Sequence, residues 1–88
     1  MSYSMAARRK HLAEVVGPNG RVRTFSERAR SLEVTCRVCV EPNPKNPNGE
    51  PRNRVVVVSE FVSKCAADWL AHEATREHQI NVERGSRR

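Results

Sequence analysis

Aromatic residues and long apolar runs are scarce in this sequence. Of its 88 residues, 5% are aromatic and 38% are hydrophobic, so the apolar core must be thin. No apolar run approaches the ~20 residues of a membrane-spanning helix, and no apolar segment follows the basic residues 8–10 as in a secretory signal. These absences predict a cytoplasmic, single-domain protein with no membrane partner, in which a metal or a partner supplements the core.

Cysteine is also sparse, with three residues, two of which form the motif Cys36-x-x-Cys39. Cytoplasmic thiols stay reduced, so this motif indicates a metal or redox site before a structural disulfide. Redox pairs lie at the start of a helix beside a βαβ unit. Here an alternating strand pattern at 32–40 runs into a β-turn at the C-x-x-C motif, and a loop at 41–53 with four prolines and four asparagines follows. The sequence therefore favours a metal.

The remaining patterns predict an α+β fold. The β-branched run at 54–59 is typical of a strand, and Pro18-Asn19-Gly20 favours a turn joining strands 11–16 and 21–25 into an N-terminal hairpin. A helix over 5–16 is the alternative, because this segment holds good helix formers. Within this scheme 1–10 is a basic arm, 26–31 is a helical turn capped by Ser26, 11–80 is the metal-binding domain and 81–88 is a basic tail that is mobile over 83–88.

The segment 60–79 is predicted to form one C-terminal helix with Ser59 as its cap. Phe61, Cys65, Trp69 and His72 fall on one apolar stripe of this helix. His72 therefore points toward the sheet, and His78 follows at the end of the helix. Two cysteines two residues apart and two such histidines can complete a tetrahedral Zn²⁺ site.

The spacing of the histidines constrains this site. Six residues of ideal helix rise about 9 Å, too far for two nitrogens bound to one ion. The helix must therefore tighten or unwind between His72 and His78, and Thr75, a mediocre helix former, lies in that stretch. Cys65 is further still from His72, so we assign it to the core beside Trp69. The predicted ligands are Cys36, Cys39, His72 and His78.

The segments Cys36-Arg37-Val38-Cys39 and 69–78 (WLAHEATREH) resemble the Cys2His2 zinc-finger family, in its branch with H-x5-H spacing. The resemblance covers 33–80 and implies a ββα zinc fold with the same four ligands. The spacer between the second cysteine and the first histidine is 32 residues, against about 12 in the family. The C-x-x-C…W…H…H order is also similar to that of small uncharacterised proteins of actinobacteria and their phages, a likeness that supplies no function.

The net charge of +6 is unevenly distributed and predicts a sequence-nonspecific nucleic-acid partner. Residues 1–31 carry +5 and 84–88 carry +3, whereas 55–83 carry −3, so the predicted helix would be repelled by phosphate in a groove. The predicted contacts are basic residues that bind backbone phosphate. They are Arg8, Arg9, Lys10, Arg21, Arg23, Arg28, Arg30, Arg87 and Arg88.

The alternative function is a protein-binding adaptor or inhibitor that presents the loop 41–53 and the acidic helix face. Prolines pre-extend such a loop and reduce the entropy lost on binding. The sequence shows no Ser-His-Asp set, glycine-rich phosphate loop or paired-carboxylate motif, so we expect neither an enzyme nor a small-molecule substrate. Four protein ligands would also close the position that a catalytic zinc leaves open.

Overall fold

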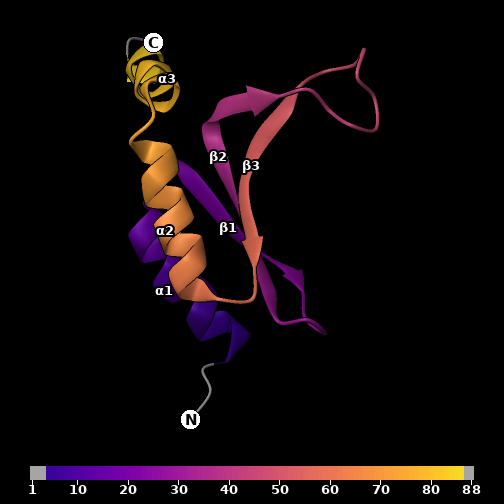
Figure 1. Cartoon of the computed structure of the whole chain (residues 1–88), viewed down its shortest axis with the longest axis vertical. Coiled ribbons are helices and arrows are strands. Elements are labelled where there is room, and N and C mark those ends of the chain that lie inside the picture. Colours follow the sequence, from indigo (N-terminus) through magenta and orange to yellow (C-terminus); the bar gives the residue numbers. More distant parts are fainter. Residues whose placement is uncertain (1–3, 87–88) are drawn as a thin grey trace.

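The computed structural model describes residues 4–86, which form a three-stranded antiparallel sheet and three helices (Figure 1). The predicted α+β class is therefore confirmed. In chain order, the elements are α1 (Met5–Val16), β1 (Gly20–Ser26), β2 (Ser31–Glu41), β3 (Arg52–Ser59), α2 (Val62–Glu73) and α3 (Arg76–Ser86).

The N-terminal segment is the helix α1, so the predicted hairpin over 11–25 is wrong and the helical alternative is correct. The Ser4 hydroxyl accepts a hydrogen bond from the Ala7 amide at 3.1 Å and caps the helix, which absorbs most of the predicted arm. Leu12 and Val16, four residues apart, are both buried. That helical spacing outweighs the turn signal, and the turn connects α1 to β1 instead of joining two strands.

The sheet has the order β1-β2-β3, with Val22 opposite Val34 and Val34 opposite Val57. The predicted strands at 32–40 and 54–59 correspond to β2 and β3. Between β1 and β2, residues 27–30 form a turn and not the predicted helical turn, although the Ser26 hydroxyl accepts from the Ala29 amide. The loop 42–51 joins β2 to β3 and projects from the far end of the sheet (Figure 1).

All three helices lie on one side of the sheet, and no other element of residues 4–86 covers its opposite face (Figure 1). Alternate residues of β2, such as Leu32 and Val34, point toward the helices and are fully buried. Together with α1 and α2 they enclose a small core. Its members are Leu12, Val16, Leu32, Val34, Cys36, Cys39, Val57, Cys65 and Trp69.

The C-terminal segment is broken into two helices, so the single helix predicted over 60–79 is wrong, although the interruption at Ala74 and Thr75 lies where the histidine spacing required it. Ser59 accepts from the Phe61 amide, and Phe61 is the residue at the cap position of α2. The helix α3 extends through Ser86, into the predicted mobile tail. No helix among residues 4–86 is long and apolar enough to cross a membrane.

Candidate metal centre

The C-x-x-C motif lies within the central strand β2, and not near a β-turn as predicted. Thr35 pairs with Val55 and Val40 with Asn53, so the ladder to β3 is interrupted across 36–39. In a regular strand Cys36 and Cys39 would point to opposite faces, because their separation is odd. The irregular pairing across 36–39 changes which side chains face the helices. Both thiols therefore point to the helix-covered side and are completely buried.

The two histidines are brought together by Thr75, which lies between α2 and α3. Its hydroxyl donates to the carbonyl of His72 at 2.7 Å and accepts from the amide of His78 at 3.2 Å. The second bond is an N-terminal cap for α3. The chain therefore turns at this residue, and α3 carries the His78 ring back toward the ring of His72.

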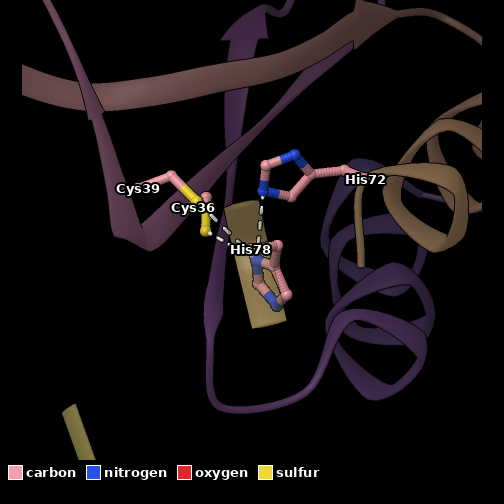
Figure 2. Close-up of side chains that lie close together, drawn as sticks. All are labelled: Cys36, Cys39, His72 and His78. Carbon is pink, nitrogen blue, oxygen red and sulfur yellow. Dashed lines mark hydrogen bonds between the residues drawn. The ribbon is translucent and has the colours of Figure 1, made fainter. Parts of the chain in front are cut away.

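The four predicted ligands converge on one point (Figure 2). Their ligand atoms, one from each residue, all lie within 4.8 Å of one another. The Nδ1 atom of His78 is 3.1 Å from Nε2 of His72, 3.4 Å from the sulfur of Cys36 and 3.8 Å from the sulfur of Cys39. The set draws on three elements, since β2 supplies both cysteines, α2 supplies His72 and α3 supplies His78.

These separations fit the edges of a metal tetrahedron. With Zn–S near 2.3 Å and Zn–N near 2.0–2.1 Å, tetrahedral angles give S–N edges of about 3.5 Å and N–N edges of about 3.3 Å. The three separations that involve His78 lie within about 0.3 Å of these values. Side chains that merely shared an apolar core would have no reason to adopt this set of spacings.

Hydrogen bonding alone does not explain the contacts of His78. Its Nδ1 atom has three polar neighbours, but a neutral ring nitrogen either donates one proton or accepts through one lone pair. An ion at the common centre would use all four groups at once, with each nitrogen and each thiolate presenting a lone pair. The chemistry of the donor set therefore fits a bound metal ion better than a hydrogen-bonded cluster.

Burial shifts the pKa values of Cys36 and His72 in the cluster. His72 and His78 are 9% and 3% exposed. Burial, helped by the charge of His78, lowers the pKa of His72 and keeps its ring in the neutral form that binds metals. Burial also raises the pKa of the Cys36 thiol, although the backbone amides of Val38 and Cys39 oppose this by hydrogen bonding to its sulfur. A metal must therefore displace a proton from Cys36.

Residues beside the cluster support it. The side-chain amide of Asn81 donates to the sulfur of Cys39 at 3.3 Å, and the indole ring of Trp69 lies 5.6 Å from each histidine ring. Sequence reasoning missed Asn81, although its position three residues after His78 places it on the same helix face. Cys65 is fully buried in the core, is absent from the cluster and contacts the Ser59 carbonyl, in agreement with its predicted role.

Two of the predicted nucleic-acid contacts, both on α1, have internal partners. The guanidinium of Arg8 donates to the carbonyls of Arg30 and Glu60, which ties α1 to the β1–β2 turn and to the start of α2. Arg9 donates to the hydroxyl of Thr24 on β1. These two residues hold the helix against the sheet.

The other predicted contacts lie elsewhere. Arg21 and Arg23 point to the uncovered face of the sheet, where Arg23 forms an ion pair with Glu33. Lys10 is exposed on α1. Arg28 and Arg30 are exposed in the turn between β1 and β2. The last two predicted contacts, Arg87 and Arg88, lie outside the described residues.

The fold and the cluster together define a small α+β domain with a buried Cys2His2 set that can hold a metal ion. Comparison with protein-family models, with curated proteins and with solved structures gives no significant match. The resemblance to ββα zinc fingers therefore rests on the ligand set. The 32-residue spacer accounts for the difference in fold, because it carries the loop 42–51, the whole of β3 and most of α2.

Proposed function

We propose that this protein is a zinc-stabilised binding module. The observation that carries the proposal is the convergence of two thiols and two imidazoles, all buried, from three separate elements. Two soft sulfur ligands and two borderline nitrogen ligands in a tetrahedral set favour Zn²⁺ over hard cations such as Mg²⁺ or Ca²⁺. Four protein ligands leave no open coordination position, so the ion would have a structural role and not a catalytic one.

Measuring the metal content of the protein tests the proposed zinc site directly. Native mass spectrometry of the purified protein should show one zinc per chain, and Cys36→Ser should lose it. The control is Cys65→Ser, which removes a buried thiol outside the cluster and should retain zinc if the protein folds. A protein that contains no zinc after purification from zinc-supplemented cells, and that binds none when titrated, would rule out the proposal.

We further infer that the partner is nucleic acid, bound through exposed arginines on β1 and on the β1–β2 turn. Arg21 on the uncovered sheet face and Arg28 in the turn are exposed, and among residues 4–86 neither guanidinium has a hydrogen-bond or ion-pair partner. Arg23 lies beside Arg21, and its partner Glu33 offsets part of its charge. Such a surface contacts backbone phosphate and does not discriminate between base sequences.

Binding of fluorescent single-stranded and duplex oligonucleotides tests this inference. Affinity should fall steeply as salt rises, because each phosphate contact releases a counterion. The double variant Arg21→Glu/Arg28→Glu should abolish binding and leave zinc content unchanged. If neither probe binds at low salt, or if the double variant binds as tightly as the parent, the nucleic-acid inference is wrong.

One observation favours the alternative role as a protein-binding adaptor. The loop 42–51 protrudes beyond the sheet and is exposed along most of its length (Figure 1). Replacing it with a short glycine-rich turn should abolish capture of a protein partner without loss of zinc. Retention of that partner by the shortened protein would count against the loop as the docking element.

A further inference from the structure

A groove of about 490 Å³ runs between α3 and the end of β2, next to the candidate metal centre. Its floor is aliphatic, with Val38 and Val40 from the strand and Ile80 from the helix. Val40 is 55% exposed and Ile80 is 39% exposed, so this floor is open to solvent. A groove of this size, with apolar side chains at its base, is comparable with the sites that bind short ligand segments.

Two arginines frame this floor. Arg76 and Arg84 both line the groove and lie four residues to either side of Ile80, so the three side chains form one stripe along α3. The separation of eight positions between the arginines corresponds to about 12 Å of helix. The acidic residue in the groove, Glu77, forms an ion pair with Arg54 of β3 at 3.2 Å. The groove therefore carries a positive charge at each end, from Arg76 and Arg84, and is close to neutral in the middle.

We propose that this groove binds an extended acidic peptide of a partner protein, with the pattern acid-x-apolar-x-acid. In an extended chain alternate side chains point the same way, and four residues span about 13 Å. Two carboxylates four residues apart would thus reach Arg76 and Arg84, while the apolar side chain between them enters the floor beside Ile80. Charge, spacing and polarity agree on this one occupant.

A nucleic-acid strand fits this groove less well. Such a strand carries a charge at every nucleotide, so a central phosphate would face Glu77 and the aliphatic floor. Among residues 4–86, no aromatic side chain lines the groove for a base to stack on.

A second copy of this chain is not the occupant. Glu73 and Glu77 are the only two acidic residues four positions apart in the sequence, and the residue midway between them is the polar Thr75. The pattern must therefore come from a different protein.

The inference rests on the proposed zinc centre, because His78 and Asn81 hold α3 against β2. The test uses the full chain and a fluorescent synthetic peptide with the core Asp-Ser-Leu-Ser-Asp between glycines. Each protein sample is first shown by native mass spectrometry to carry one zinc per chain. A zinc-loaded protein that ignores the peptide counts against the groove alone, whereas a protein without zinc counts against both proposals.

We expect saturable binding that is at least about tenfold tighter than for a scrambled peptide of the same composition. Arg76→Gln and Arg84→Gln, at exposed positions, should each weaken binding by up to about fivefold, as for a surface ion pair. The double reversal Arg76→Glu/Arg84→Glu should abolish peptide binding and spare nucleic-acid binding. The control Arg21→Glu/Arg28→Glu changes the net charge equally and should leave peptide binding intact.

Equal binding of the scrambled peptide would overturn the proposal, as would equal loss of peptide binding in both double variants. If instead Arg76→Glu/Arg84→Glu removes binding of an oligonucleotide and not of the peptide, the groove belongs to the nucleic-acid surface and the peptide proposal is wrong.

Discussion

The two ends of this domain are held together by different means. At one end, α1 and α2 pack against the sheet through fully or nearly fully buried apolar side chains, among them Leu12, Val16 and Leu32. We call this the apolar end. At the other, the metal end, α3 meets the last part of β2, and among residues 76–85 of α3 only His78 is buried. Because the metal end buries so little of α3, we expect its structure to depend on an ion.

Trp69 connects the two ends. Its ring lies against Gly20 on the apolar side and within ring-contact distance of His72 and His78 on the other. The comparison shows how a short chain with few aromatic residues can organise six elements. One large side chain closes the core, and a buried Cys2His2 cluster that can hold a metal ion lies where the composition supplies no second core.

The largest effect that we predict is that of zinc removal. Chelation should release α3 and disorder the end of β2, with loss of helical circular dichroism and a fall in melting temperature of more than about 20 °C, because structural zinc contributes on the order of 10 kcal/mol in small domains. His11→Ala, at the exposed third histidine, should change neither zinc content nor melting temperature. A chelated protein with the full helical signal would show that the metal end needs no ion.

The next largest effect should follow from removing the Trp69 side chain, which connects the two ends. Trp69→Ala should destabilise the zinc-loaded protein by about 3–5 kcal/mol, because it opens a cavity between the core and the metal centre. The neighbouring Leu70 is 55% exposed, so Leu70→Ala should cost no more than about 0.5 kcal/mol. Urea unfolding measures both variants. Similar losses in the two would mean that Trp69 does not link the two ends.

A smaller effect is expected at Gly20 in the apolar end. A Cβ atom there would lie 2.2 Å from Cγ1 of Val16 and 2.8 Å from the ring of Trp69, so Gly20→Ala should cost about 1–3 kcal/mol through overpacking. At Gly85 in α3 a Cβ atom meets nothing within 4 Å, and Gly85→Ala should be neutral or stabilise by up to about 1 kcal/mol. The same unfolding assay compares them, and equal effects would contradict the packing described here.

At the metal end, Asn81 should affect zinc affinity and not the packing of the core. Asn81→Ala removes the hydrogen bond to the sulfur of Cys39 and should weaken zinc affinity about tenfold, as measured by competition with a chromogenic chelator. Gln79→Ala, at an exposed position on the same helix, is the control. An unchanged affinity in Asn81→Ala would show that this bond has no influence on the ligand set.

The most gradual effect should be that of pH on zinc affinity. Zinc would have to displace a proton from Cys36, whose raised pKa keeps it a thiol at neutral pH, so affinity should rise with pH between 6 and 8. Burial lowers the pKa of His72 from its ordinary value of 6.5. Its ring is therefore neutral above pH 6.5, and protons compete with zinc for this ring only at lower pH. Competition titrations at several pH values check this. A flat profile would mean that the thiols are already ionised without metal.

The ligand set and the strands could be predicted from sequence because their signals are local. C-x-x-C, the β-branched run of β3 and the apolar stripe of α2 each lie within a short window. The helix break was also predictable, since the rise per residue forbids a continuous helix between His72 and His78 on one ion. These inferences needed standard geometry and no knowledge of the tertiary structure.

The wrong predictions concern segments whose strand-pairing partners lie far away in the sequence. The segment 11–16 contains only two core residues, Leu12 and Val16, so in the sequence their spacing of four is a weak signal beside the turn that follows, although it prevails in the structure. Whether β1 pairs with a preceding strand or with β2 depends on long-range contacts. The bulge that turns Cys36 and Cys39 to the same face depends likewise on β3, across the loop 42–51. No local pattern in the sequence encodes either arrangement.

The position of the loop 42–51 has a practical consequence. It leaves the sheet after Glu41 and returns at Arg52, outside the segments that carry the ligands and the core. Lengthening a surface loop costs little, about 0.6 kcal/mol for each doubling. An epitope tag or a small fluorescent reporter inserted between Lys45 and Gly49 would therefore label the folded, metal-loaded protein. The two-residue link at Ala74 and Thr75 tolerates no such insertion, since one extra residue would turn His78 away from the site.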